Sequence, residues 1–246
     1  MTAPAPPTPD RRIVVVTAGL SKPSSTRMLA DRLASATADA LAAQGDQASV
    51  NVIELRDHAH AVVDATLTGF PSGALADALA AVATADALIA VTPLFTTTYS
   101  GLFKSFIDII DPDALRGTPV LLGATGGTAR HSLAVEYSMR PLFTYLRADV
   151  VTTSVFAATD DWSDGGVLAG ADAVNPLPAR IDRAARDLAD RVQSRPARAD
   201  SAAARDNEGV GGDTSTRSIT PRPGETTDFS ATPSFADLIA QTGVTA

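Results

Sequence analysis

Segments with the length and apolar content of buried strands alternate along this chain with longer segments that have the pattern of helices. Five segments predict strands, near residues 12–18, 49–54, 86–92, 118–124 and 149–156. Five others predict helices, near residues 25–43, 73–83, 99–110, 128–146 and 177–193. Alternation with short connections indicates parallel strands that are covered by helices on both faces. We therefore expect an α/β protein with a doubly wound, five-stranded parallel sheet.

The composition excludes several classes of function. The chain has 246 residues, a formal net charge of −8 and no cysteine. Without cysteine, disulfides, thiol nucleophiles, iron–sulfur clusters and cysteine zinc sites are excluded. The acidic balance argues against a surface for the phosphate backbone, so we expect no nucleic-acid partner. Residues 1–10 lack the pattern of a signal peptide, and no segment has the pattern of a membrane span, so we expect a cytoplasmic protein.

The segment after the third predicted strand carries the strongest functional signal. A proline, several hydroxyl residues and a glycine lie between residues 92 and 101, ahead of an apolar helix. In an open parallel sheet, ligands bind at the carboxyl ends of the strands. Proline fixes the chain direction and removes one donor, so the remaining amides can face a planar ligand. An ordinary strand-to-helix turn would share this pattern, but we predict a ligand-bordering loop formed by Pro93, Leu94, Phe95 and Thr96.

Hydroxyl side chains cluster at the start of the first predicted helix, where Ser21, Ser24, Ser25 and Thr26 follow Gly19. A helix N-terminus offers free N–H groups and a dipole that favours an anion, and hydroxyls add donors. The sequence has neither the glycine-rich dinucleotide fingerprint nor the Gly-Lys-Ser/Thr phosphate loop. The pattern predicts a site for a phosphate monoester, and simple N-capping by serine is the alternative.

A third polar loop follows the fourth predicted strand and contains Thr125, Gly126, Gly127 and Thr128. Paired glycines let the backbone approach a flat ring closely, because no Cβ intervenes. A turn or a helix cap would explain this loop equally well by itself. Three such loops after the first, third and fourth strands of one α/β pattern instead indicate a single ligand site.

Together the three loops resemble those of the NADPH-dependent FMN reductases, a flavodoxin-like family, over roughly residues 11 to 160. The segments 129–137 and 139–146 are similar to the actinobacterial members that serve luciferase-like flavin-dependent monooxygenases. The resemblance implies a flavodoxin-like sheet of order 2-1-3-4-5, with its crevice between strands one and three. It also implies FMN, as prosthetic group or substrate, and NADPH or NADH as the hydride donor.

The resemblance further implies a role for each loop. The first loop would hold the FMN phosphate, the second would border the ring, and the third would close its pyrimidine side. No catalytic side chain and no metal is required, because hydride passes directly from nicotinamide to flavin. The predicted helix at 99–110 is apolar over more than one face, which in this family implies a homodimer or a dimer of dimers.

Several alternatives stay open at this point. A quinone or azo-dye reductase would share the fold, and a flavodoxin-type electron carrier is the non-enzymatic alternative. Ring-facing loops that offer only Phe95 and Tyr99 as aromatics favour the reductase. The donor stays open as well, with three arginines as candidates for a 2′-phosphate contact, Arg27, Arg56 and Arg130.

Other polar clusters are weaker candidates. His58 and His60 are placed in a loop without a third ligand, so we expect no metal site. His131 is expected to face solvent. The acidic cluster of Asp160, Asp161 and Asp164 is expected to be a solvated loop, in which Trp162 covers part of the crevice.

The chain is expected to divide into a reductase domain, residues 11–193, and a low-complexity tail, residues 194–246. The tail is rich in Ala, Arg, Asp, Gly, Ser, Thr and Pro, and such a composition predicts disorder. One short apolar island interrupts it at residues 235–239. Within the domain, Pro141 should kink or divide the fourth predicted helix.

Overall fold

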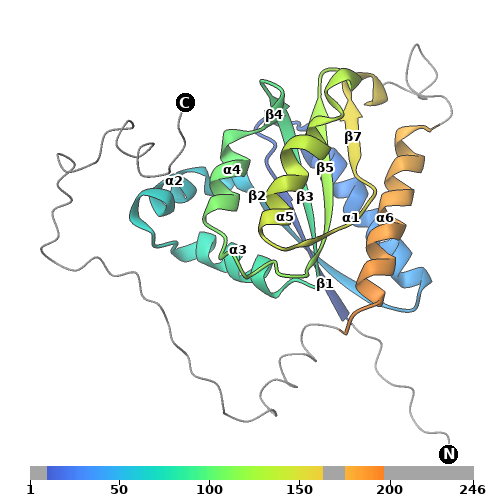
Figure 1. Cartoon of the computed structure of the whole chain (residues 1–246), viewed down its shortest axis with the longest axis horizontal. Helices are drawn as coiled ribbons and strands as arrows, with labels where there is room; N and C mark the ends of the chain where they lie inside the picture. The colour runs from blue at the N-terminus through green and yellow to red at the C-terminus, as the bar shows by residue number, and fades with distance from the viewer. Residues whose placement is uncertain (1–9, 163–174, 197–246) are drawn as a thin grey trace, which may run out of the picture. The chain divides into compact units, whose positions relative to one another are not determined.

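The structure, a computed structural model, describes residues 10–162 and 175–196 of the chain (Figure 1). Asp164, the apolar island at 235–239 and nearly all of the predicted tail lie outside the described residues. Among the described helices, none combines the length and the hydrophobicity needed to cross a membrane. The strands are β1 (Asp10–Thr17), β2 (Gln47–Glu54), β3 (Ala87–Phe95), β4 (Thr98–Tyr99), β5 (Pro119–Gly126), β6 (Asp149–Val150) and β7 (Val155–Ala158). The α-helices are α1 (Ser25–Ala43), α2 (Ala59–Thr68), α3 (Gly73–Thr84), α4 (Gly101–Asp108), α5 (Arg140–Tyr145) and α6 (Leu177–Gln193).

The sheet confirms the predicted fold class and strand order. Its strands run β2-β1-β3-β5-β6, and all of these neighbours pair in parallel. Since β5 is the fourth predicted strand, this is the flavodoxin-like order. The predicted fifth strand divides in two: β6 pairs with the beginning of β5 and β7 with its end. The additional strand β4 forms an antiparallel hairpin with β3.

Helices cover both faces of the sheet, as the alternation predicts (Figure 1). Successive residues of β1 point to opposite faces, because side chains alternate along a strand. Ile13 and Val15 pack with buried side chains of α1 and α6, whereas Val14 and Val16 pack with those of α2 to α5. Because β1, β3 and β5 pair in parallel, their carboxyl ends lie side by side at one end of the sheet, between the two hydrophobic layers.

Sequence reasoning missed the helix α2. The predicted loop at His58 and His60 is instead a short 3₁₀ turn, Leu55–His58, followed directly by α2. His58 therefore ends the 3₁₀ turn and His60 lies on α2. Val62 and Ala65 of this helix are buried in the same core layer as Phe103 and Phe106 of α4. In the same layer, the ring centroids of Phe103 and of Phe143 from α5 are 6.3 Å apart. The apolar width of α4 is thus explained within one chain.

The fourth predicted helix is divided into three pieces. A 3₁₀ turn at Ala129–His131 is followed by a π-helical turn at Val135–Met139 and then by α5. Pro141 is among the first residues of α5, where a proline is tolerated, so it begins a helix and does not kink one.

Glu136 anchors this divided segment to the connection between β6 and β7. Arg140 donates to both carboxylate oxygens of Glu136, at 2.5 and 2.9 Å, and Ser154 donates to one of them at 2.7 Å. Arg140 also donates to the Val151 carbonyl at 3.0 Å. The hydrogen bonds from Arg140 are the main cause that lowers the pKa of Glu136 below its ordinary value; burial opposes them, and the bond from Ser154 adds to the decrease.

The network predicts a pH-dependent contribution to stability. A carboxyl whose pKa is depressed in the folded protein stabilises it above the ordinary pKa of a glutamate, and this contribution is lost as pH falls through the lower, folded value. Glu136→Gln should therefore lower the free energy of unfolding at pH 7 by about 1 kcal/mol or less, because the pair is partly exposed. The difference from wild type should shrink in urea titrations carried out at progressively lower pH below about 4. A difference that stays constant over this range would contradict the role of the Glu136 charge.

Candidate functional site

Four loops at the carboxyl ends of β1, β3, β5 and β7 enclose one cavity of about 660 Å³. Its wall contains side chains from the loop between β1 and α1, the end of β3, the end of β5 and a 3₁₀ turn after β7 (Thr159–Trp162). The lining residues are Leu20, Ser21, Pro23, Ser24, Ser25, Thr26, Met28, Pro93, Leu94, Phe95, Thr125, Gly126, Gly127, Thr159 and Trp162.

Except for Thr96 and Thr128, the residues predicted to bind a ligand all line this cavity. Thr96 lies at the exposed tip of the hairpin between β3 and β4. The Thr128 side chain instead accepts a hydrogen bond from the backbone N–H of Arg130, at 3.4 Å. Leu20, Pro23, Met28 and Thr159 were missed. The first three flank the predicted serines and could have been included on that ground, whereas nothing near Thr159 in the sequence marks it.

The hydroxyls of the first loop divide into two kinds. Ser24 is buried and caps α1, since its Oγ accepts from the Arg27 N–H at 3.2 Å. Thr26 is also buried, and its hydroxyl hydrogen-bonds that of Thr125 at 2.8 Å, which joins the first loop to the third. Ser21 and Ser25 are exposed on the cavity wall. These two hydroxyls are therefore the first loop's donors most accessible to a ligand.

Gly19 is required near the beginning of the first loop, just after β1. A Cβ at this position would overlap the Ser24 hydroxyl and lie 3.2 Å from the Thr26 Cβ. Any larger residue would therefore displace the capping side chain.

The second loop is held in a strained turn. Thr96 and Thr97 connect β3 to β4 and have φ of 50° and 70°. A two-residue hairpin with two positive φ values favours Asn and Gly, so threonines are an unusual choice. The turn brings Leu94 opposite Tyr99 and Phe95 opposite Thr98. Phe95 consequently stands at the cavity with 47% of its surface exposed, whereas Tyr99 packs on Phe103 and does not line the cavity.

The two glycines of the third loop have different surroundings. A Cβ on Gly126 would lie 3.0 Å from the Phe156 ring, so this glycine permits close packing within the protein. A Cβ on Gly127 would meet no atom within 4 Å. Gly127 therefore leaves space beside the cavity that a flat ligand can approach.

The acidic cluster, which lies in the fourth loop, was expected to be solvated, and for Asp161 this expectation is wrong. Asp161 is not simply solvated: it accepts from the Ala158 N–H at 2.8 Å and forms an ion pair with Arg180 of α6. These two contacts of Asp161 anchor the turn that carries Trp162. As predicted, Trp162 lies at the cavity. The Trp162 ring lies beneath the guanidinium of Arg32, 5.0 Å from its centroid.

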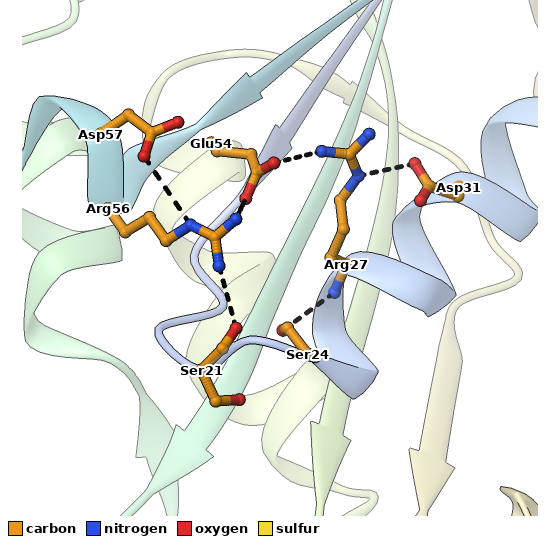
Figure 2. Close-up of polar contacts among 7 residues, drawn as sticks. All are labelled: Ser21, Ser24, Arg27, Asp31, Glu54, Arg56 and Asp57. Atoms are coloured by element: carbon orange, nitrogen blue, oxygen red, sulfur yellow. Dashed lines mark hydrogen bonds and ion pairs between the residues drawn. The ribbon is translucent and has the colours of Figure 1, made fainter.

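Two arginines proposed as 2′-phosphate ligands are paired with carboxylates. Arg27 and Arg56 both form ion pairs with Glu54 at the end of β2, and Arg27 also pairs with Asp31 at 2.7 Å (Figure 2). The hydrogen bond from Arg27 to Asp31 is the main cause that raises the pKa of Arg27; burial opposes this, and the charges of Asp31 and Glu54 add to the rise. Neither arginine lines the cavity.

The donor set suits a flavin mononucleotide. Ser25 and Thr26 are the first residues of α1, so their N–H groups have no intrahelical acceptor. Together with the Ser21 and Ser25 hydroxyls they can surround a phosphate. The apolar border of Pro93, Leu94 and Phe95 and the space at Gly127 suit a flat ring. Within residues 10–162 and 175–196, no three His, Asp or Glu side chains are grouped to hold a metal.

Comparison with known proteins identifies the class to which this fold and site belong. Residues 11–163 match the family described as NADPH-dependent FMN reductase. The FMN reductase (NADPH) of Pseudomonas aeruginosa is 36% identical over 179 residues, which are 72% of this chain and 90% of that protein. The NADH-dependent FMN reductase SfnE of Pseudomonas putida is 35% identical over 173 residues, 70% of this chain and 88% of that protein.

Solved structures agree with these relatives. An oxidoreductase from Corynebacterium diphtheriae is 41% identical and superposes with a TM-score of 0.70, over 76% of this chain and 98% of that one. The NADH:FMN oxidoreductase EMOB in its apo form is 31% identical with a TM-score of 0.58, over 71% of this chain and 88% of that one.

The chain therefore belongs to the NADPH-dependent FMN reductase family. It is an oxidoreductase, a flavin reductase that depends on NAD(P)H. Because the chain belongs to this family, it is the enzyme and not the flavodoxin-type electron carrier.

Proposed function

We propose that this reductase binds FMN in the four-loop cavity, with the phosphate at the start of α1 and the ring between the second and third loops. The observation that supports this most is the convergence of the loops after β1, β3 and β5 on one cavity. A phosphate site and a flat apolar slot within the same cavity match the two ends of FMN.

In this proposal FMN supplies the redox chemistry by accepting hydride from the nicotinamide ring. The protein's residues hold and orient the reactants. Ser21, Ser25 and the first amides of α1 bind the phosphate, while Pro93 to Phe95 border the ring. The buried hydrogen bond between the Thr26 and Thr125 hydroxyls, 2.8 Å long, holds the first loop next to the third loop. Correct placement of two rings in contact is the main contribution a protein makes to such a transfer.

We further propose that reduced FMN is released to a luciferase-like flavin-dependent monooxygenase. The resemblance of segments 129–137 and 139–146 supports this, as does the position of Phe95, which lines the cavity and is half-exposed. Adding such a monooxygenase should couple NAD(P)H oxidation to its product. Stoichiometric coupling supports the proposal, and unchanged hydrogen peroxide formation contradicts it.

A homodimer or dimer of dimers is proposed on the α5 side of the molecule. Tyr137 and Tyr145 are 77% and 82% exposed, beside a cavity of about 680 Å³ that Ile107, Pro141 and Leu142 also line. Exposed apolar patches of this kind mark protein interfaces. Sedimentation of the full chain tests this proposal directly.

The choice of acceptor can be tested in steady-state assays. With NADH and with NADPH in turn, we expect FMN to give a higher kcat/KM than FAD, a quinone or an azo dye. The sequence has one predicted phosphate loop, which suits FMN. It lacks a dinucleotide-type fingerprint that would bind the adenylate half of FAD. A quinone or azo dye that is reduced more efficiently than FMN would instead support the alternative reductase.

A further inference from the structure

We propose that Glu54 is a positioning residue that holds the phosphate loop in its binding geometry through two arginines. The inference deepens the proposed function and rests on it. Glu54 is the last residue of β2 and lies beside Thr17, the last residue of β1, in the parallel register. It therefore stands next to the point where the phosphate loop leaves the sheet.

The two oxygens of Glu54 connect, through the two arginines, to two different points of the loop. Oε1 pairs with Arg27, and Oε2 pairs with Arg56. Arg56 donates from Nη1 to the Ser21 carbonyl at 2.9 Å, in the middle of the loop between β1 and α1. Arg27 lies in the first turn of α1, and its backbone N–H donates to the Ser24 Oγ at 3.2 Å, at the end of the loop. Figure 2 shows this chain of contacts from Ser21 to Ser24 through one carboxylate.

The burial of these groups distinguishes them from ordinary surface ion pairs. The side chains of Glu54 and Arg56 are each 18% exposed, and that of Arg27 is 34% exposed. Exposed pairs contribute little because solvent screens them and the side chains lose entropy. Here one carboxylate fixes two guanidinium groups at once, and one of them also binds backbone of the loop.

The groups that the two arginine side chains contact also support a positioning role. They do not line the cavity: they form ion pairs with Glu54, Asp31 and Asp57, and Arg56 also donates to the Ser21 carbonyl. Their positive charges are therefore used to shape the loop, while the Ser21 and Ser25 hydroxyls face the ligand. A carboxylate placed near a phosphate site would repel the anion if it were unpaired, so the two arginines also neutralise Glu54.

The experiment compares binding of FMN and riboflavin, which share the ring but differ in the phosphate. In the full-length protein, Glu54→Gln should reduce the preference for FMN over riboflavin by roughly tenfold, the size expected when a hydrogen bond to a charged group is misplaced. Riboflavin affinity should stay within about twofold of wild type. Arg56→Met, which removes the contact with the Ser21 carbonyl, should reduce the same preference.

Asp31→Asn and Asp57→Asn are the matched controls. Each removes one negative charge from an arginine of the same network but leaves Glu54 between the two arginines. Both should keep the wild-type preference for FMN. An unchanged FMN preference in Glu54→Gln would overturn the positioning role, as would equal losses of FMN and riboflavin, which would indicate general destabilisation. A wild-type protein without any preference for FMN would instead contradict the proposed phosphate site itself.

Discussion

Replacing Ser21 and Ser25 together with alanine should weaken FMN binding by about a hundredfold to ten-thousandfold, because two hydrogen bonds to a charged group are lost and each contributes about 1.5 to 3 kcal/mol. Both side chains are exposed on the cavity wall, and the Ser21 carbonyl, which Arg56 contacts, is kept in the variant. Fluorescence titration of FMN and of riboflavin measures the change. Riboflavin binding should be almost unaffected.

Ser24→Ala is the informative comparison for this pair. Ser24 is the N-cap of α1, so its loss should lower the free energy of unfolding by about 1 kcal/mol. The Ser21 and Ser25 variant should unfold like wild type. Equal FMN affinity in the double variant and in wild type would place the phosphate elsewhere and reduce the first loop to a helix cap.

Asp46→Ala should cause the largest loss of stability, about 3 to 5 kcal/mol, because it leaves a buried guanidinium without its partner. The Arg11 Nε and the Asp46 Oδ2 are 2.8 Å apart, and their side chains are only 7% and 8% exposed. Arg11 also donates to the Arg195 carbonyl at 3.0 Å, beyond the end of α6. This pair lies at the beginning of β1, at the edge of the sheet opposite the cavity.

Urea unfolding of Asp46→Ala and of Asp108→Ala measures this effect against an exposed pair. Asp108 pairs with Lys104 at 2.5 Å, but its side chain is 50% exposed, so its removal should cost less than about 1 kcal/mol. Similar losses for the two variants would show that the buried pair has no special contribution.

The fold could be predicted from the sequence because its signals are local. The β-branched run at 13–16 and the helix at 25–43 each show their period within a few residues, and the structure has them there. The segment 59–68 has a glycine cap at its end, Gly69 with a φ of 77°, but no side-chain cap at its start, and it packs in the same core layer as α4. The division of 149–156 depends on how two short strands pair with β5, which no local pattern reveals.

The sequence predicted the loops of the candidate site and a role for each loop, but not the separate roles of residues within a loop. Ser21, Ser24, Ser25 and Thr26 look alike in sequence, and only tertiary contacts separate the capping Ser24 and the Thr125-bonded Thr26 from the two exposed serines. Trp162, on the turn after β7, and Glu54, at the end of β2, contribute from segments that are distant in sequence from the first loop. The turn at Thr96 and Thr97 gave no glycine or asparagine signal for its positive φ values.

The location of FMN is the central claim, and a crystal structure of the full chain soaked with FMN tests it most directly. We predict the phosphate within hydrogen-bond distance of Ser21, Ser25 and the first amides of α1, and the ring between Phe95 and Gly127. The groove of about 770 Å³ between α1 and α6, which Arg32 and Arg186 help to line, is an alternative large cavity, as is the cavity beside Tyr137 and Tyr145. FMN bound in that groove, or with its phosphate away from the start of α1, would contradict the account.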